Sequence, residues 1–226
     1  MASPRTWLAQ AFRHPSAALL LVQLLGLLLY PLMEATPSGR ALFGAFGLLV
    51  LGTALRMVRH SPAATWVALV LAVLVVALSV LHAIAPNPLI LVATAALNAA
   101  FYFYAAASLI AYMLQDLEAT TDEIFAAGAT FTLLAWAFAY LFIVCQAVSP
   151  GSFSALIDPH ADRTWMELLF LSFTTLSGVG LGDIVPLTPI ARGVVMLEEF
   201  TGVMYIALVL SRLVALTTLR RGRDAF

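Results

Sequence analysis

The residues of this chain with the clearest chemical potential are three glycines at alternate positions, Gly178, Gly180 and Gly182, within the segment SGVGLGD. Glycine takes backbone conformations that a side chain disfavours. Alternate glycines therefore allow successive carbonyl oxygens to point in one direction. Carbonyl oxygens that line a pore can replace the water around a cation. The spacing predicts a short stretch of backbone that binds a cation.

The apolar run before these glycines, TWMELLFLSFTTLS (164–177), must position them. A helix of about 14 residues is roughly 21 Å long, which is too short to cross a bilayer. Thr164 and Glu167 have the spacing of a capping box, which marks a helix start. Non-helical backbone inside a membrane is tolerated only where it is buried in protein or faces water. We therefore expect a re-entrant helix whose negative C-terminal end points into a water-filled cavity and favours cations.

The composition indicates an integral membrane protein. Of the 226 residues, 62% are hydrophobic and 10% are charged, whereas a soluble domain carries about 25% charged residues. The formal net charge of −1 gives no basic surface for nucleic acid, so we expect no such partner. The single cysteine, Cys145, lies in an apolar run and is expected to pack in the core.

Six segments reach the roughly 20 apolar residues that a spanning helix needs. They are approximately 16–33, 41–58, 63–85, 88–115, 124–147 and 189–217. The expected fold class is an all-α integral membrane protein with six transmembrane helices, a re-entrant pore helix and a filter loop.

The arginines set the expected orientation. Three groups of arginines precede the first segment, lie between the second and third, and follow the sixth, which puts these groups on one side, whereas Arg40 and Arg163 fall on the other. An excess of arginine marks the cytoplasmic side. We therefore expect a multi-pass protein of the plasma or inner membrane with both termini in the cytoplasm.

The same segments predict three parts: a four-helix transmembrane domain (1–115), an acidic cytoplasmic linker (116–123) and a pore domain (124–226). In the linker, Thr120 or Thr121 is expected to cap the next helix, with Asp122 and Glu123 in its first turn. The alternative is a cytoplasmic cation or proton sensor.

The segment 88–115 contains no charged residue before Asp116, although it occupies the place of a voltage-sensing helix. Arginines moving through the membrane field supply the energy of voltage gating. We therefore expect no conventional voltage sensor in residues 1–115.

The stretch SFTTLSGVGLGDIVP (172–186) resembles the pore loop of tetrameric potassium channels, whose filter usually reads Thr-Val-Gly-Tyr-Gly-Asp. The resemblance covers the pore domain. It implies a homotetramer in the lipid bilayer that conducts K⁺ passively, because one subunit offers only one strand of carbonyls. It implies no enzyme activity and no cofactor other than K⁺ in the filter.

The resemblance assigns the K⁺ ligands to the carbonyl oxygens of four residues: Gly178, Val179, Gly180 and Leu181. The expected supporting residues are Thr174, where some relatives have a filter-supporting Glu, Ser177 before the filter, and Gly182 and Asp183 at its outer end.

The chain also departs from the family pattern. Gly178 replaces a Thr whose hydroxyl helps to form the innermost ion site, so that site is expected to be weaker. Leu181 replaces an aromatic residue, and Phe170 and Leu171 stand where its pore-helix partner is expected, which predicts an apolar cuff. Arg192 is a candidate partner for Asp183.

Glu198 and Glu199 interrupt the last apolar segment. Carboxylates inside a membrane are costly and usually face the bundle interior. We expect them beside the pore loop as filter support, either changing protonation during gating or forming a structural hydrogen bond. Gly202 is either a gating hinge or a site of close packing with the 124–147 helix.

Other functions remain open at this point. The altered filter also fits a weakly selective cation channel. A secondary transporter uses broken helices, often in two repeats, but residues 1–115 hold no second broken segment. An intramembrane serine protease is disfavoured, because Thr175 stands where its motif before Ser177 needs Gly and no His follows His160 to act as a base.

Overall fold

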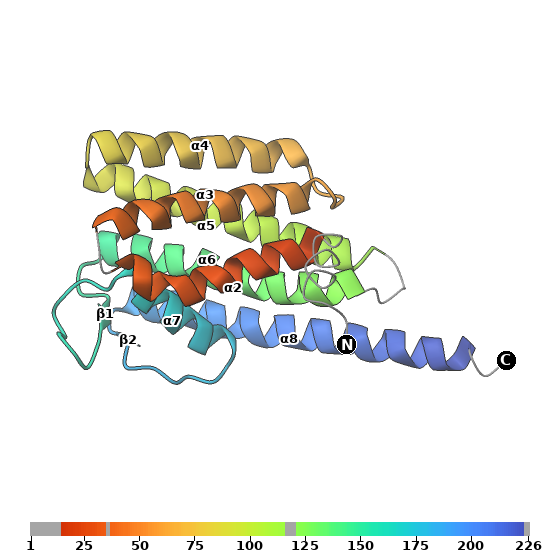
Figure 1. Cartoon of the computed structure of the whole chain (residues 1–226). Helices are drawn as coiled ribbons and strands as arrows, with labels where there is room; N and C mark the ends of the chain where they lie inside the picture. Colours follow the sequence, from red (N-terminus) through yellow and green to blue (C-terminus); the bar gives the residue numbers. More distant parts are fainter. Residues whose placement is uncertain (1–14, 35–36, 116–120, 224–226) are drawn as a thin grey trace. The chain divides into compact units, whose positions relative to one another are not determined.

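The computed structural model describes residues 15–34, 37–115 and 121–223, with side chains described within 15–30, 46–115 and 122–212. Helices make up most of this part of the chain (Figure 1). The helices are α2 (Pro15–Glu34), α3 (Pro37–Val58), α4 (Thr65–Ile84), α5 (Pro88–Met113), α6 (Thr121–Val148), α7 (Trp165–Leu176) and α8 (Pro189–Arg223). Two short strands, β1 (Phe153–Ser154) and β2 (Val185–Pro186), flank α7 in the sequence.

Each of the six apolar segments expected from the sequence coincides with a helix. Among the described residues, four helices are long and apolar enough to cross a membrane: Thr65–Ile84, Pro88–Met113, Asp122–Val148 and Pro189–Arg212. The apolar helical parts described in α2 and α3 are shorter, Pro15–Tyr30 and Phe46–Val58. By length and composition, four helices are therefore able to cross a membrane, and six spans remain a prediction.

Local sequence signals explain where several helices begin. Four of them, α2, α3, α5 and α8, start at a proline, whose fixed φ and missing N–H suit the first helical position. The side chain of Asn87 accepts the backbone N–H of Leu89 at 2.8 Å, and Thr188 Oγ1 accepts that of Ala191 at 3.3 Å. Such contacts satisfy N–H groups that the first turn leaves without partners.

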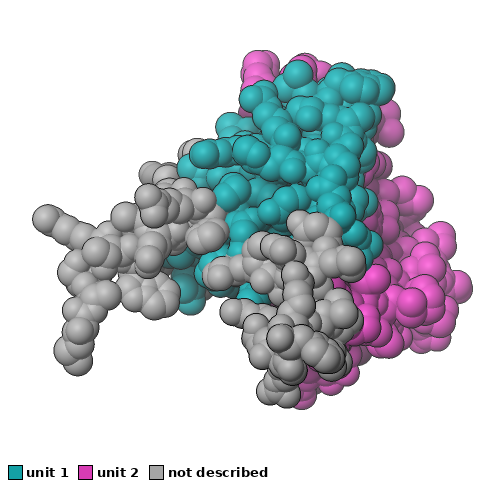
Figure 2. Space-filling model, turned by 90° about the vertical axis from the view of Figure 1, so that its right-hand side faces the viewer, with its two compact units in different colours: residues 1–72, 104–132 teal, residues 73–103, 133–226 magenta. Residues whose placement is uncertain are grey.

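The chain divides into two compact units (Figure 2). The first comprises residues 1–72 and 104–132. In this unit, two glycines lie against large side chains. A methyl group added to Gly26 would lie 2.2 Å from Cε1 of Phe46, and one added to Gly128 would lie 2.9 Å from Cδ2 of Leu20. Glycines thus let α2 approach both α3 and α6 within this unit.

Buried polar contacts also join α2 to α6 in the first unit. Ser16 Oγ donates to Asp122 Oδ2 at 2.8 Å, and Tyr112 Oη reaches the same oxygen at 3.2 Å. Asp122 and Glu123 lie in the first turn of α6, as the sequence predicted. Of the two predicted caps, Thr121 is the first residue of α6, and Thr120 lies outside the described residues. Asp122 therefore fixes neighbouring side chains as well as lying at the helix N-terminus.

The second unit comprises residues 73–103 and 133–226 and contains the glycine-rich segment. Aromatic rings build part of its core: Trp136 lies 5.6 Å from Tyr102 and 5.2 Å from Trp165, measured between ring centroids. Both pairs meet edge to face, a favoured arrangement of aromatic rings. Trp165 is the first residue of α7, so these rings hold the start of that helix against α6.

The sequence did not predict the strand pair in the second unit. β1 and β2 pair antiparallel, with Phe153 opposite Pro186 and Ser154 opposite Val185. The N–H of Leu187 extends the pairing by donating to the carbonyl of Ser152 at 2.8 Å. The strand pair thus holds the segment before α7 next to the segment that follows the glycines.

Candidate cation-binding site

The helix α7 has the start that the sequence predicted. Thr164 Oγ1 accepts the N–H of Glu167 at 3.3 Å, and Glu167 Oε2 accepts the N–H of Thr164 at 2.6 Å. This reciprocal pair confirms the capping box. The helix has 12 residues, or roughly 18 Å, so it cannot span a bilayer.

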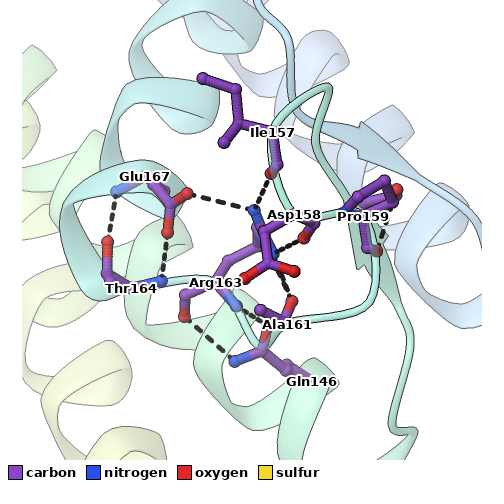
Figure 3. A network of polar contacts seen from close by, with 9 residues as sticks. Gln146, Ile157, Asp158, Pro159, Ala161, Arg163, Thr164 and Glu167 are labelled. Carbon is purple, nitrogen blue, oxygen red and sulfur yellow. Dashed lines mark hydrogen bonds and ion pairs between the residues drawn. The ribbon is translucent and has the colours of Figure 1, made fainter.

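A buried arginine organises the loop before α7 (Figure 3). Arg163 is only 4% exposed. Its guanidinium donates to the carbonyl of Asp158 at 2.6 Å and to Glu167 Oε1 at 3.2 Å, and its Nε donates to the carbonyl of Ala161 at 3.0 Å. Its backbone N–H donates to Gln146 Oε1 on α6 at 2.7 Å. Arg163 thus ties loop, capping box and α6 together.

Sequence reasoning missed this role of Arg163. The only local signal is its spacing of four residues from Glu167, at which opposite charges meet on a helix. The carbonyls that it binds carry no sequence signature. Asp158, one of these partners, has a φ of 54°, a conformation that Asp tolerates better than most residues.

The chain folds back onto the end of α7 as soon as the helix stops. The carbonyl of Thr174 accepts the N–H groups of Val179 at 3.1 Å and Gly180 at 3.0 Å, and the N–H of Gly178 donates to Thr175 at 3.0 Å. The last turn of a helix leaves carbonyls without helical partners, and the loop satisfies them. Thr174 thus contacts the loop through its carbonyl, while its hydroxyl donates to Leu171 at 2.9 Å.

The glycines at alternate positions take left-handed backbone conformations. The φ of Gly178 is +71° and that of Gly180 is +63°. L-residues with side chains are strained in this region, β-branched ones most of all. Gly178 therefore has a backbone conformation that the Thr of the potassium-channel pattern would avoid. The presence of Gly in place of Thr is consistent with this positive φ.

The loop is open to its surroundings in a single chain. The side chains of Val179 and Leu181 are 60% and 69% exposed. Phe170, 47% exposed, borders the outer end of the loop: a methyl group on Gly182 would lie 3.6 Å from its ring carbon Cε1 and 3.8 Å from Thr174 Oγ1. Of the two expected cuff residues, Phe170 therefore borders the loop, and Leu171 is buried.

The expected pairing of Arg192 with Asp183 is wrong. Both residues belong to the described part of the chain, and no ion pair joins them there. Arg192 Nε donates to the carbonyl of Pro186 at 3.2 Å. This carbonyl lies closer in sequence to Arg192 and ends strand β2, so the side chain binds the strand next to it.

One side of α8 faces the rest of the unit. Buried residues recur at alternating intervals of four and three: Ala191, Val195, Glu198, Gly202 and Tyr205. This spacing follows one face of a helix. Glu199 is exposed, so of the two neighbouring glutamates only Glu198 lies on the buried face.

Glu198 reaches the middle of α7. It is 0% exposed, and its carboxyl oxygen Oε1 is hydrogen-bonded to the hydroxyl of Ser172. The same hydroxyl lies 2.8 Å from the carbonyl of Ala135 on α6. One serine therefore bridges α8 and α6 from the helix that carries the glycine loop. Sequence reasoning found Glu198 by its burial cost but did not identify its partners.

Gly202 lies against the last residue of α7. A methyl group added to Gly202 would lie 2.0 Å from the carbonyl oxygen of Leu176 and 2.8 Å from its carbonyl carbon. Close packing is therefore its role in this structure, but the expected partner was wrong, because the contact is with α7 and not with the 124–147 helix. The hinge hypothesis for Gly202 stays a prediction.

These elements together place a carbonyl-rich loop at the end of a half-length helix, between two apolar helices long enough to span a membrane. Residues 129–218, which run from within α6 to within α8 and include α7 and the glycine loop, match a family model described as ion channel. Comparison with curated proteins and with solved structures gave no match.

Proposed function

We propose that this chain, whose residues 129–218 match a family model described as ion channel, conducts K⁺ passively through the carbonyl oxygens of Gly178, Val179, Gly180 and Leu181. The observation that carries the proposal is the pair of left-handed glycines, Gly178 and Gly180. Alternating backbone conformations on a loop anchored to Thr174 favour carbonyls that point to one side.

The residue types of the loop support a monovalent metal ion bound by backbone oxygens. Val179 and Leu181 have no side-chain oxygen, so ligands between Gly178 and Leu181 must come from carbonyls. Divalent Ca²⁺ and Mg²⁺ sites usually contain carboxylates, and Asp183 stands beyond these four residues. Neutral carbonyls that replace the hydration shell suit K⁺.

The single chain supports assembly into a homotetramer. One loop supplies one strand of carbonyls, which cannot surround an ion, and its side chains at Val179 and Leu181 are mostly exposed. Large apolar side chains also cover the outward faces of α8, among them Met196, Leu197, Phe200 and Val203. Lipid and neighbouring copies of the chain are the surroundings that such faces require.

The proposal includes the arrangement expected from the sequence: six spans, cytoplasmic termini in the plasma or inner membrane, and a pore domain (124–226) after a four-helix domain (1–115) and a linker (116–123). The segment α5 carries no charged residue between Pro88 and Met113. Gating by a conventional voltage sensor is therefore not part of the proposal.

Tracer flux in liposomes that contain the purified chain tests this function. We expect rubidium, a close mimic of K⁺, to enter along its gradient without saturation and without a coupling ion, and sodium to be excluded. Equal entry of both tracers would indicate the weakly selective cation channel. Saturable entry that needs a second ion would indicate a transporter, and impermeable liposomes would contradict ion conduction.

A further inference from the structure

We propose that Glu198 is protonated in the conducting channel and positions α7 through a chain of two hydrogen bonds, from its carboxyl O–H to Ser172 and from the Ser172 hydroxyl to Ala135. Ionisation of Glu198 breaks this chain and reduces conduction. The proposal rests on the proposed ion conduction and adds a residue that positions the filter, with control by pH.

The count of hydrogen atoms at Ser172 supports the protonated state. A serine hydroxyl carries one hydrogen and accepts others. Here it lies within hydrogen-bonding distance of two oxygens, Oε1 of Glu198 and the carbonyl oxygen of Ala135. A carbonyl only accepts, and an ionised carboxylate also only accepts. Both contacts are hydrogen bonds at the same time only if Glu198 donates to Ser172.

The surroundings of the carboxyl group agree with this count. Glu198 is 0% exposed, and its second oxygen, Oε2, is buried without a hydrogen-bond partner among the described residues. An ionised carboxylate needs partners on both oxygens, and a buried charge without them is costly. A neutral acid leaves only one weak acceptor unsatisfied.

The helices around Glu198 supply no free cation to balance an ionised carboxylate. The titratable and charged residues of α7, of 133–148 in α6 and of the turns of α8 around Glu198 are Glu167, Tyr140, Cys145, Arg192, Glu199 and Tyr205. Arg192 stands six residues, or roughly 9 Å of helix, from Glu198 and is bound to Pro186.

The hydrogen-bond chain leads directly to the filter loop. Ser172 lies two residues before Thr174, whose carbonyl holds the N–H groups of Val179 and Gly180. A displacement of α7 therefore moves the backbone of the candidate ion site. When Glu198 ionises, Ser172 must turn its one hydrogen to the carboxylate, and its bond to Ala135 on α6 is lost.

Infrared spectroscopy of the full chain in lipid tests the protonated state without any ion flux. We expect a protonated carboxyl stretching band in neutral solution that is lost in Glu198→Gln and kept in Glu199→Gln, the matched control on the exposed face. The band should also disappear as the wild-type protein is made alkaline. A wild-type spectrum that Glu198→Gln leaves unchanged would overturn the proposal.

Rubidium flux against pH tests the positioning role. We expect wild-type and Glu199→Gln flux to fall in alkaline solution, whereas Glu198→Gln keeps its flux, because its amide donates to Ser172 and does not ionise. Ser172→Ala should lower flux already at neutral pH. If Ser172→Ala keeps the flux of the wild type, the positioning role of Glu198 is overturned. It is also overturned if Glu198→Gln loses flux in alkaline solution as the wild type does.

The two measurements separate this inference from the proposed function. If the infrared band behaves as expected but no variant passes ions, the protonated state stands and ion conduction fails. If ions pass and the band is absent, conduction stands and the proposed state of Glu198 fails.

Discussion

Gly202 on α8 packs directly against the backbone of Leu176, the last residue of α7, with room for no side chain between them. One helical turn earlier on each helix, Glu198 binds Ser172. Both contacts join residues 26 positions apart in the sequence, so α7 and α8 run in the same direction with a fixed register. The end of α7, where the glycine loop begins, is thus held by α8 through a backbone contact at Leu176 and a side-chain contact at Ser172.

Replacement of Gly202 by Ala should destabilise the packing of α7 against α8. The added methyl group overlaps the carbonyl of Leu176, and overpacking of this kind costs roughly 1–3 kcal/mol. Thermal unfolding in detergent measures the effect. Gly193→Ala is the matched control on the same helix, because no atom lies within 4 Å of its added methyl group. This control should be neutral or stabilise by up to about 1 kcal/mol; equal destabilisation by the two variants would contradict the packing.

Replacement of Gly178 or Gly180 by Ala should abolish selective conduction. Both glycines have a positive φ, which costs an L-residue roughly 1–2 kcal/mol, and relief of that strain would turn a carbonyl away from the ion. Rubidium flux measures the loss. Gly151→Ala, at a φ of +74° in the loop before α7, carries the same strain away from the filter. It should lower stability but keep flux, and a filter variant that also keeps wild-type flux would rule out the assigned ligands.

Arg163→Ala should destabilise the loop before α7 much more than Arg192→Ala. Arg163 is buried and donates to several carbonyls and to Glu167, and a hydrogen bond to a charged group contributes about 1.5–3 kcal/mol. Arg192 is exposed, and among the described contacts its side chain donates only to the carbonyl of Pro186. Because solvent screens charged groups at an exposed position, this contact contributes little to stability. Limited proteolysis of residues 149–163 measures the difference. Equal cleavage of both variants would show that Arg163 does not hold the loop.

The purified chain should form particles of fourfold symmetry. One subunit leaves Val179 and Leu181 mostly exposed, and the proposed tetramer needs four such loops to complete a ring of carbonyls around an axis. Averaged electron-microscopy images in lipid nanodiscs measure the symmetry. Particles with one copy of the chain would exclude a pore built from these loops.

The sequence predicted those features that depend on local patterns. Hydropathy located the helices, the spacing of Thr164 and Glu167 located the start of α7, and alternate glycines located the loop of unusual backbone. Each signal lies within a few neighbouring residues and reflects one physical requirement, such as helix capping or a positive φ.

The contacts that the sequence did not predict join residues far apart in the chain. Ser172 meets Ala135 across 37 positions, and strands β1 and β2 have two residues each, too few to show a period of two. Close packing was one of two interpretations of Gly202 from the sequence, and its partner Leu176 depends on how α8 returns beside α7. Arg192 was a candidate partner for Asp183, whereas its side chain donates to the nearby carbonyl of Pro186.

The reversal potential with K⁺ on one side of a bilayer and Na⁺ on the other tests the central claim most directly, namely selective binding of K⁺ by the backbone of the glycine loop. Selective conduction through Gly178, Val179, Gly180 and Leu181 predicts a reversal potential far from zero, with the sign that K⁺ permeation sets. A reversal potential near zero would contradict selectivity for K⁺, even if the chain conducts both ions.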